Sequence, residues 1–214
     1  MGHVAEQERR GIEILRAGGV IVFPTDTVYG LGADAFNAEA VNRVYAIKQR
    51  PRHLPFPVLV ADVAQLALLT EQVGGIVAFL AERFWPGGLT LVVRKSATLP
   101  AHLSSDTGVA VRLPNHPIPR SLIRGLGKPI VGTSANLSGA PAASTAEEAE
   151  TQLGSAVDLV IDGGESSENR ESTIVDITGA SPVVLRHGII APEEFIAACR
   201  EYLEANPDAH RYRL

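Results

Sequence analysis

Cysteine is nearly absent from this 214-residue sequence, because Cys199 is the only one. A single thiol excludes an internal disulfide framework and any zinc cluster built on thiolates. Cys199 lies at helical spacing with Phe195 and Leu203. We therefore expect a buried core residue rather than a nucleophile.

Long hydrophobic runs are also lacking. No uninterrupted apolar stretch reaches the roughly 18 residues that a membrane span needs. The N-terminal residues 1–7 contain no apolar signal core. Together these absences predict a cytoplasmic protein that has no membrane partner.

Positive charge is scarce, and lysine is the rarer of its two sources. Of the nineteen basic residues only Lys48, Lys95 and Lys128 are lysines, the formal net charge is -5, and aromatic residues make up 5%. These values argue against an extended RNA-binding surface with stacking platforms, so any anion site must be local. The arginine bias favours planar, bidentate contacts to phosphate or carboxylate, although genome composition would produce the same bias.

The sequence also lacks the two common nucleotide-binding motifs, the P-loop and the dinucleotide fingerprint, in the two segments that could bind a nucleotide. Segments 24–32 and 132–139 are rich in hydroxyls and glycine, but neither has the P-loop or the dinucleotide-fingerprint spacing. Both follow apolar runs, and the hydroxyls, amide and backbone N–H groups of 132–139 suit a phosphate or ribose. For segment 24–32 the alternative is an ordinary turn whose threonines satisfy its own backbone.

What the sequence does contain is an irregular alternation of helical and strand-like patterns. Helical spacing predicts helices at 8–17, 38–48, 63–69, 76–84, 117–125, 144–153 and 192–204. Short apolar runs predict strands at 20–23, 58–60, 89–93, 109–113, 129–131, 157–161, 172–177 and 183–185. In the turn after the helix 76–84, we expect Gly87 and Gly88 to permit positive φ.

No repeat, low-complexity tract or long linker divides the chain. We therefore expect one domain over residues 1–214, with a core at about 8–205 and a flexible tail at 206–214. Helices and strands that alternate irregularly predict an α/β fold with a mixed, twisted sheet.

Cationic side chains gather in the turn 48–53, where Lys48, Arg50 and Arg52 are followed by His53. This cluster suits a polyanion, and a helix-to-strand loop is a common place for ligand groups. The alternatives are a solvated basic loop, or cations that complement the C-terminus of the preceding helix.

A further cation, Arg112, interrupts the apolar run 109–113. Arginine is almost never buried unpaired, so we expect either an acidic neighbour or an anionic ligand such as a carboxylate beside it.

Taken together, these segments resemble the YrdC/TsaC family of threonylcarbamoyl-AMP synthases. The resemblance rests on FPTDTVYGLGADAFN (23–37), AIKQRPRHLPFPVLV (46–60), WPGGLTLVV (85–93), VAVRLPNHP (109–117), GTSANLSGAP (132–141), ESTIVD (171–176) and VLRHG (184–188). The paired signatures K-x-R, at Lys48 and Arg50, and S-x-N, at Ser134 and Asn136, are specific to the family in combination. The chain looks like the family's short, single-domain form.

The resemblance implies a sheet that curves around a large basic cavity, and a nucleotidyltransferase reaction within it. L-threonine, bicarbonate or CO2, and ATP would give L-threonylcarbamoyl adenylate and pyrophosphate. The implied role is N6-threonylcarbamoyladenosine modification of tRNA, in which downstream tRNA-modifying proteins take the adenylate. Binding of tRNA itself is compatible with this role but not required.

The same resemblance implies roles for individual residues. Lys48 and Arg50 would be catalytic and hold the triphosphate, while Ser134, Asn136 and Arg186 would contact ATP. The residues implied to hold L-threonine are Thr27, Arg112, Ser172 and Thr173. Magnesium is expected on the phosphates, but no carboxylate pair identifies its ligands. His187 and Phe56 depart from the residues usual at their positions, and the general base stays unassigned.

Two other functions compete with this prediction. The first is a non-catalytic RNA- or ribosome-binding protein of the same fold, since a concave basic surface also suits a phosphate backbone. The second is a carbamoyl-transfer relative, of the kind found in hydrogenase maturation. A divergent family branch ranks lower, because both signatures are intact.

Overall fold

The computed structural model describes residues 2–104 and 107–207. Its α-helices are α1 (Gly2–Arg16), α2 (Ala38–Lys48), α3 (Ile76–Phe84), α4 (Pro117–Leu126), α5 (Ala146–Leu153) and α6 (Pro192–Ala205). Three short 3-10 helices are η1 (Val63–Leu68), η2 (Ala101–Leu103) and η3 (Gly154–Ala156). None of the helices in these ranges has the length and apolar character to cross a bilayer.

The strands form one mixed sheet. They are β1 (Ile21–Phe23), β2 (Gly30–Asp34), β3 (Val58–Leu59), β4 (Leu89–Arg94), β5 (Gly108–Arg112), β6 (Ile130–Ser134), β7 (Leu159–Val160), β8 (Thr173–Asp176) and β9 (Val183–Arg186). Their order is β7-β1-β2-β6-β3-β5-β4-β8-β9. The pairs β1/β7, β3/β5 and β4/β8 are parallel and the other pairs antiparallel, which confirms the expected mixed α/β sheet.

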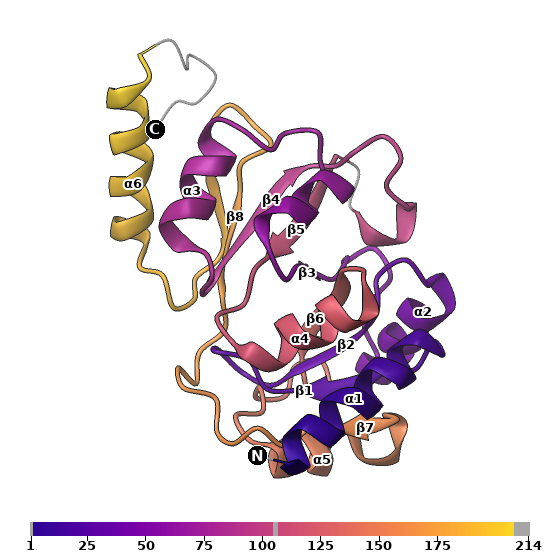
Figure 1. Ribbon diagram of the computed structural model, residues 1–214. Coiled ribbons are helices and arrows are strands. Elements are labelled where there is room, and N and C mark those ends of the chain that lie inside the picture. The colour runs from indigo at the N-terminus through magenta and orange to yellow at the C-terminus, as the bar shows by residue number, and fades with distance from the viewer. Residues whose placement is uncertain (1, 105–106, 208–214) are drawn as a thin grey trace.

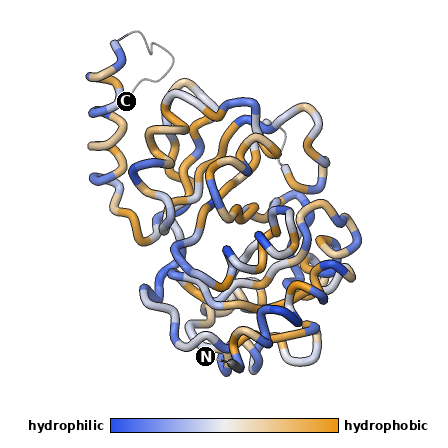
Figure 2. The backbone as a smooth tube through the Cα atoms, in the orientation of Figure 1, coloured by the Kyte–Doolittle hydropathy of each residue, from blue (hydrophilic) through white to orange (hydrophobic). Residues whose placement is uncertain are grey.

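Helices cover both faces of this sheet, and each face has its own core (Figure 1). The smaller core joins α1 and α4 to strand residues such as Phe23 and Ile130. The larger core contains side chains of α2, α3, α5 and α6, including Cys199, which confirms that Cys199 is a buried core residue. Helix α6 is amphipathic, with hydrophilic and hydrophobic segments alternating along it in Figure 2.

The largest error of the sequence-based prediction is at residues 30–34. They form strand β2, antiparallel to β1, whereas segment 24–32 was expected to be a loop. Strand β2 was not predicted because it contains Gly30 and Gly32, and glycine is a poor strand former. The structure needs glycine there, since a Cβ on Gly30 would lie 2.9 Å from Cε2 of Phe23 and one on Gly32 would lie 2.4 Å from the carbonyl oxygen of Val131.

Smaller errors concern the bounds and types of other elements. Gly132, Thr133 and Ser134 continue strand β6 instead of opening the loop, residues 63–68 form a 3-10 helix, and α1 begins earlier than predicted. Gly87 and Gly88 do not have positive φ. Glycine is needed at position 88 because there is no room for a side chain. A Cβ there would lie 2.1 Å from Cγ2 of Ile189. Of the expected tail, residues 208–214 lie outside the described residues.

Candidate functional site

A cavity of about 470 Å³ opens on one face of the sheet, a volume typical of small-molecule sites. Its floor is built by strand alternation, because residues two apart on a strand share a face. Thr90 and Val92 of β4, Ala110 and Arg112 of β5, and Ser172 and Ile174 at β8 all line the cavity in this way. The pattern that buries an apolar sheet face thus also delivers polar groups to the cavity.

A more open cleft of about 600 Å³ adjoins the cavity. The two spaces share five lining residues, which are Arg50, Leu54, Ser134, Glu171 and Arg186. The cleft adds Lys48 and Asn136, and the cavity adds Arg112. Four cations therefore line the two adjoining spaces.

Arg112 is only 7% exposed and makes the acidic contact that one of the two sequence-based alternatives required. Its Nη2 donates to Oδ1 of Asp26 at 2.6 Å, its Nη1 donates to Oγ1 of Thr27 at 2.8 Å, and its Nε donates to the carbonyl of Gly87 at 2.9 Å. Burial lowers the pKa of Arg112, and the charge of Asp26 opposes that effect. Two guanidinium N–H groups remain for a ligand in the cavity, because the side chain has five.

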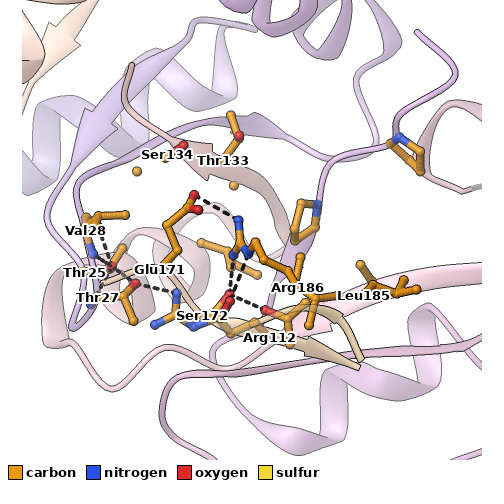
Figure 3. Close-up of a pocket in the computed structure, with 18 of the residues that line it drawn as sticks. Thr25, Thr27, Val28, Arg112, Thr133, Ser134, Glu171, Ser172, Leu185 and Arg186 are labelled. Atoms are coloured by element: carbon orange, nitrogen blue, oxygen red, sulfur yellow. Dashed lines mark hydrogen bonds and ion pairs between the residues drawn. The ribbon is translucent and has the colours of Figure 1, made fainter. Parts of the chain in front are cut away.

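The turn after β1 holds Asp26 and Thr27 in place. Oγ1 of Thr25 accepts from the backbone N–H groups of Thr27 and Val28 and donates to the carbonyl of Val28 at 2.6 Å. The threonine hydroxyl thus satisfies its own backbone, as the alternative for this segment proposed. The result is also a cavity wall, because Thr25 and Thr27 both line the cavity (Figure 3).

Lys48 is 2% exposed at the end of α2. Its Nζ donates to the carbonyls of Ser134 and Asn136, both at 2.7 Å, and to Oδ1 of Asn136 at 2.8 Å. An ammonium group has three N–H donors, so all of them are used within the protein. Lys48 thereby fixes the segment after β6, and it can act on an anion in the cleft through its charge.

Burial lowers the pKa of Lys48 to about 8. The nearby charge of Arg50 lowers it further, while the charge of Glu171 opposes both effects. A substantial fraction of Lys48 is therefore uncharged near pH 8 when no anion is bound.

Arg50 follows the left-handed residue Gln49, which ends α2 with φ 51°. Its Nε donates to the carbonyl of Leu54 at 3.1 Å, and its guanidinium carbon lies 5.3 Å from the centre of the Phe56 ring. Arg52 instead donates to Oδ1 of Asn42 and lines neither space. Only part of the basic turn thus reaches the site.

Arg186 reaches the site from β9 and is held by the segment before β8. Its Nε donates to the carbonyl of Ser172, its Nη2 to Oγ of Ser172 and its Nη1 to Oε1 of Glu171, at 2.9–3.0 Å (Figure 3). Oγ of Ser172 also lies 2.8 Å from Oγ1 of Thr90. This network joins β4, β8 and β9 at the edge of the cavity.

Eight of the nine site residues expected from the resemblance line the cavity or the cleft. They are Thr27, Lys48, Arg50, Arg112, Ser134, Asn136, Ser172 and Arg186. Thr173 does not line either space and is fully buried. Its Oγ1 accepts from the backbone N–H groups of Gly188 and Ile190 and donates to the carbonyl of Ile190, so it fastens the segment after β9 behind the cavity wall.

Sequence reasoning missed several lining residues, above all Glu171, Thr90, Thr25 and Thr133. Glu171 belongs to the quoted ESTIVD stretch, but no periodicity marks a carboxylate at that place. Thr90 had a usable signal, because it is a hydroxyl inside an apolar strand. His187 is exposed and lines neither space, so its position gives no support to a role as base.

Within the described residues, no group of three or more His, Cys, Asp or Glu side chains could hold a metal ion. Burial also raises the pKa of the Cys199 thiol to about 11, which leaves it protonated and unreactive. The functional groups that line the site are therefore cations, hydroxyls and one carboxylate, set among apolar walls. These groups suit positioning and charge neutralisation more than nucleophilic attack by the protein.

Known proteins match most of the chain. The Sua5/YciO/YrdC family, described as telomere recombination, matches residues 13–188. A Pyrococcus abyssi protein named threonylcarbamoyl-AMP synthase is 41% identical over 182 residues, which are 84% of this chain and 53% of that protein. A Vibrio cholerae protein of the same name is 38% identical over 194 residues, which are 86% of this chain and 99% of that protein.

A solved structure is similar over the same region. The crystal structure of P. abyssi Sua5 complexed with L-threonine superposes with a TM-score of 0.86 at 38% identity, covering 89% of this chain and 56% of that one. The chain spans about half the length of the curated relatives from P. abyssi and Bacillus subtilis.

The lowered pKa of Lys48 predicts proton uptake when a polyanion binds in the cleft. An anion favours the charged ammonium and raises its pKa, so binding of pyrophosphate at pH 8 should take up a fraction of a proton and weaken as the pH rises through 8. Calorimetry at pH 8 in buffers of different ionisation enthalpy measures this uptake. Lys48→Met should lose the part of the proton uptake that comes from Lys48. Lys128→Met, which removes an exposed lysine, should keep the wild-type uptake. Equal uptake by wild type and Lys48→Met would refute the assignment.

Proposed function

Because the chain belongs to the Sua5/YciO/YrdC family, we propose that it makes L-threonylcarbamoyl adenylate from L-threonine, CO2 or bicarbonate, and ATP. The observation that carries this proposal is the joining of two spaces. A cavity lined by Arg112 and Thr27 adjoins a larger cleft lined by Lys48, Arg50 and Arg186. Such a site can hold an amino acid and a triphosphate side by side.

In the proposed reaction the threonine amine captures CO2 and loses a proton to give a carbamate. A carbamate oxygen then attacks the α-phosphorus of ATP, the bond to the β-phosphate oxygen breaks, and pyrophosphate leaves. No protein nucleophile is needed, so the protein's contribution is positioning and charge neutralisation. The cations and hydroxyls that line the site can supply both.

The amino acid would lie at the Arg112 end of the cavity. The free N–H groups of Arg112 would donate to its carboxylate, supported by Thr27, and Ser172 would lie nearby. The L-threonine named in the P. abyssi complex supports this part of the proposal, since that chain is similar over 89% of this one.

The nucleotide would lie across the boundary and in the cleft. Arg50 and Arg186 line both spaces and would meet the phosphates, with Ser134 and Asn136 beside them. Lys48 would add its charge and hold Ser134 and Asn136 in place. Departing pyrophosphate would be stabilised mainly by Arg50 and Lys48.

Magnesium is part of this proposal as a companion of ATP. Glu171 is the one carboxylate that lines the site within the described ranges, so phosphate oxygens and water would supply most ligands of the ion. The product would pass to proteins that build N6-threonylcarbamoyladenosine on tRNA.

Pyrophosphate release tests the proposal directly. With ATP, magnesium and bicarbonate, the purified protein should release pyrophosphate only when L-threonine is added, and the nucleotide product should have the mass of threonylcarbamoyl adenylate. Tight ATP binding with no such product would contradict the proposed chemistry.

Arg50→Ala tests the phosphate assignment. Loss of this cation should lower kcat/KM about 30- to 1,000-fold, or about 2–4 kcal/mol, because its contacts matter most in the transition state. Arg52→Ala is a matched control, since Arg52 is two residues away and contacts Asn42 instead of the site. Equal losses in the two variants would show that general basicity of the turn, and not a phosphate contact, is responsible.

A further inference from the structure

The ion pair between Glu171 and Arg186 lies at the boundary between the cavity and the cleft. Both residues line both spaces, and Nη1 of Arg186 lies 2.9 Å from Oε1 of Glu171. The side chains of Arg186 and Glu171 keep 35% and 39% of their exposure. An ion pair that keeps this much contact with solvent contributes little to stability, so stability alone gives little reason for a carboxylate at this point.

Glu171 is the only anion among the side chains that line the site in the part of the chain described by the structure. Burial lowers the pKa of both Lys48 and Arg186, and the charge of Glu171 opposes that lowering in each case. Its Oε1 accepts from Arg186, while Oε2 accepts no hydrogen bond from residues 2–104 or 107–207. Figure 3 shows the carboxylate pointing into the cavity towards Arg186. One oxygen is thus available to a ligand.

A free amino acid carries two opposite charges, and each needs a partner when it leaves water. If Arg112 receives the carboxylate, the ammonium group requires an acceptor on the same cavity. The other acidic group near Arg112 is Asp26, which already holds the guanidinium at 2.6 Å and does not line the cavity. Glu171 is therefore the available anionic acceptor.

We propose that Glu171 accepts the ammonium group of the amino-acid substrate and thereby releases Arg186 for the phosphates of the nucleotide. This inference rests on the proposed function and names the residue that links its two substrates. The ammonium group competes with Arg186 for Glu171, and the phosphates compete with Glu171 for Arg186. Whichever ligand binds first separates the Glu171–Arg186 pair, so the second ligand binds with a more favourable free energy.

Linkage makes this effect reciprocal. The amino acid must tighten nucleotide binding by the same factor by which the nucleotide tightens amino-acid binding. No covalent bond changes in this exchange, so it can be measured by binding alone, without turnover.

Calorimetry with L-threonine and a non-hydrolysable ATP analogue measures the factor. In wild type, each ligand at saturation should lower the Kd of the other on the order of fivefold or more. Glu171→Gln keeps the shape of the side chain and removes its charge. This variant should bind the analogue alone more tightly than wild type, bind L-threonine more weakly, and show a coupling factor near one.

Glu168→Gln is the matched control, because it makes the same change of charge in the same polar segment. Glu168 is exposed, lines neither space, and contacts Asp26 only through its backbone N–H. It should keep the wild-type coupling. In turnover, Glu171→Gln should raise the KM for L-threonine, while Glu168→Gln should not.

The possible results separate this inference from the proposed function. Independent binding of the two ligands to wild type, or coupling that survives Glu171→Gln, overturns the inference and leaves the proposed function intact. An unchanged Kd for L-threonine in Glu171→Gln overturns the ammonium contact. Failure of folded wild type to bind either ligand overturns both.

Discussion

Cations recessed in a cavity need oxygen partners from the protein itself, because an unpaired buried charge is strongly destabilising. Arg112 donates to Asp26 and Thr27 in the turn after β1, Lys48 donates to carbonyls at the end of β6 and just after it, and Arg186 donates to the carbonyl and hydroxyl of Ser172 ahead of β8. Each of these contacts joins two segments that are separate in the sequence. The same hydrogen bonds that make the charges tolerable therefore also fix the walls of the site.

This arrangement prepares the site before any ligand arrives. Thr25 holds its own turn, Lys48 holds Ser134 and Asn136, and Ser172 connects Thr90 with Arg186. Groups that are already oriented need little rearrangement when charge develops on a phosphate, and that is how a site without a nucleophile accelerates a reaction. The exception is the partly exposed Glu171–Arg186 pair, whose partners a ligand would exchange under our proposal.

Sequence patterns predicted most of the sheet and the bounds of α2 and α3. Asn37 caps the start of α2, and Pro86 stands just beyond the end of α3. Sequence patterns also predicted that Arg112 needs a partner, from the energetic cost of burial alone. Strand β2 was missed because its glycines are required by the close approach of Phe23 and Val131, which no local pattern reveals. The pairing of Arg112 with Asp26 could not be assigned either, since it depends on which strands become neighbours.

Whether a predicted site residue reaches the site also depends on the three-dimensional fold. The resemblance marked nine side chains, and eight of them line the cavity or the adjoining cleft. Thr173 lies behind the wall because strand alternation turns it away from Ser172 and Ile174. Glu171 carries no pattern of its own, and its importance follows only from its place among four cations.

We propose that one continuous site holds the amino acid at Arg112 and the triphosphate at the cleft. A crystal structure of the protein with L-threonine and a non-hydrolysable ATP analogue tests it most directly. We expect the threonine carboxylate at about 3 Å from the Arg112 guanidinium, with the phosphates beside Arg50 and Arg186. Phosphates bound at Arg112, with L-threonine outside the cavity, would contradict this proposal.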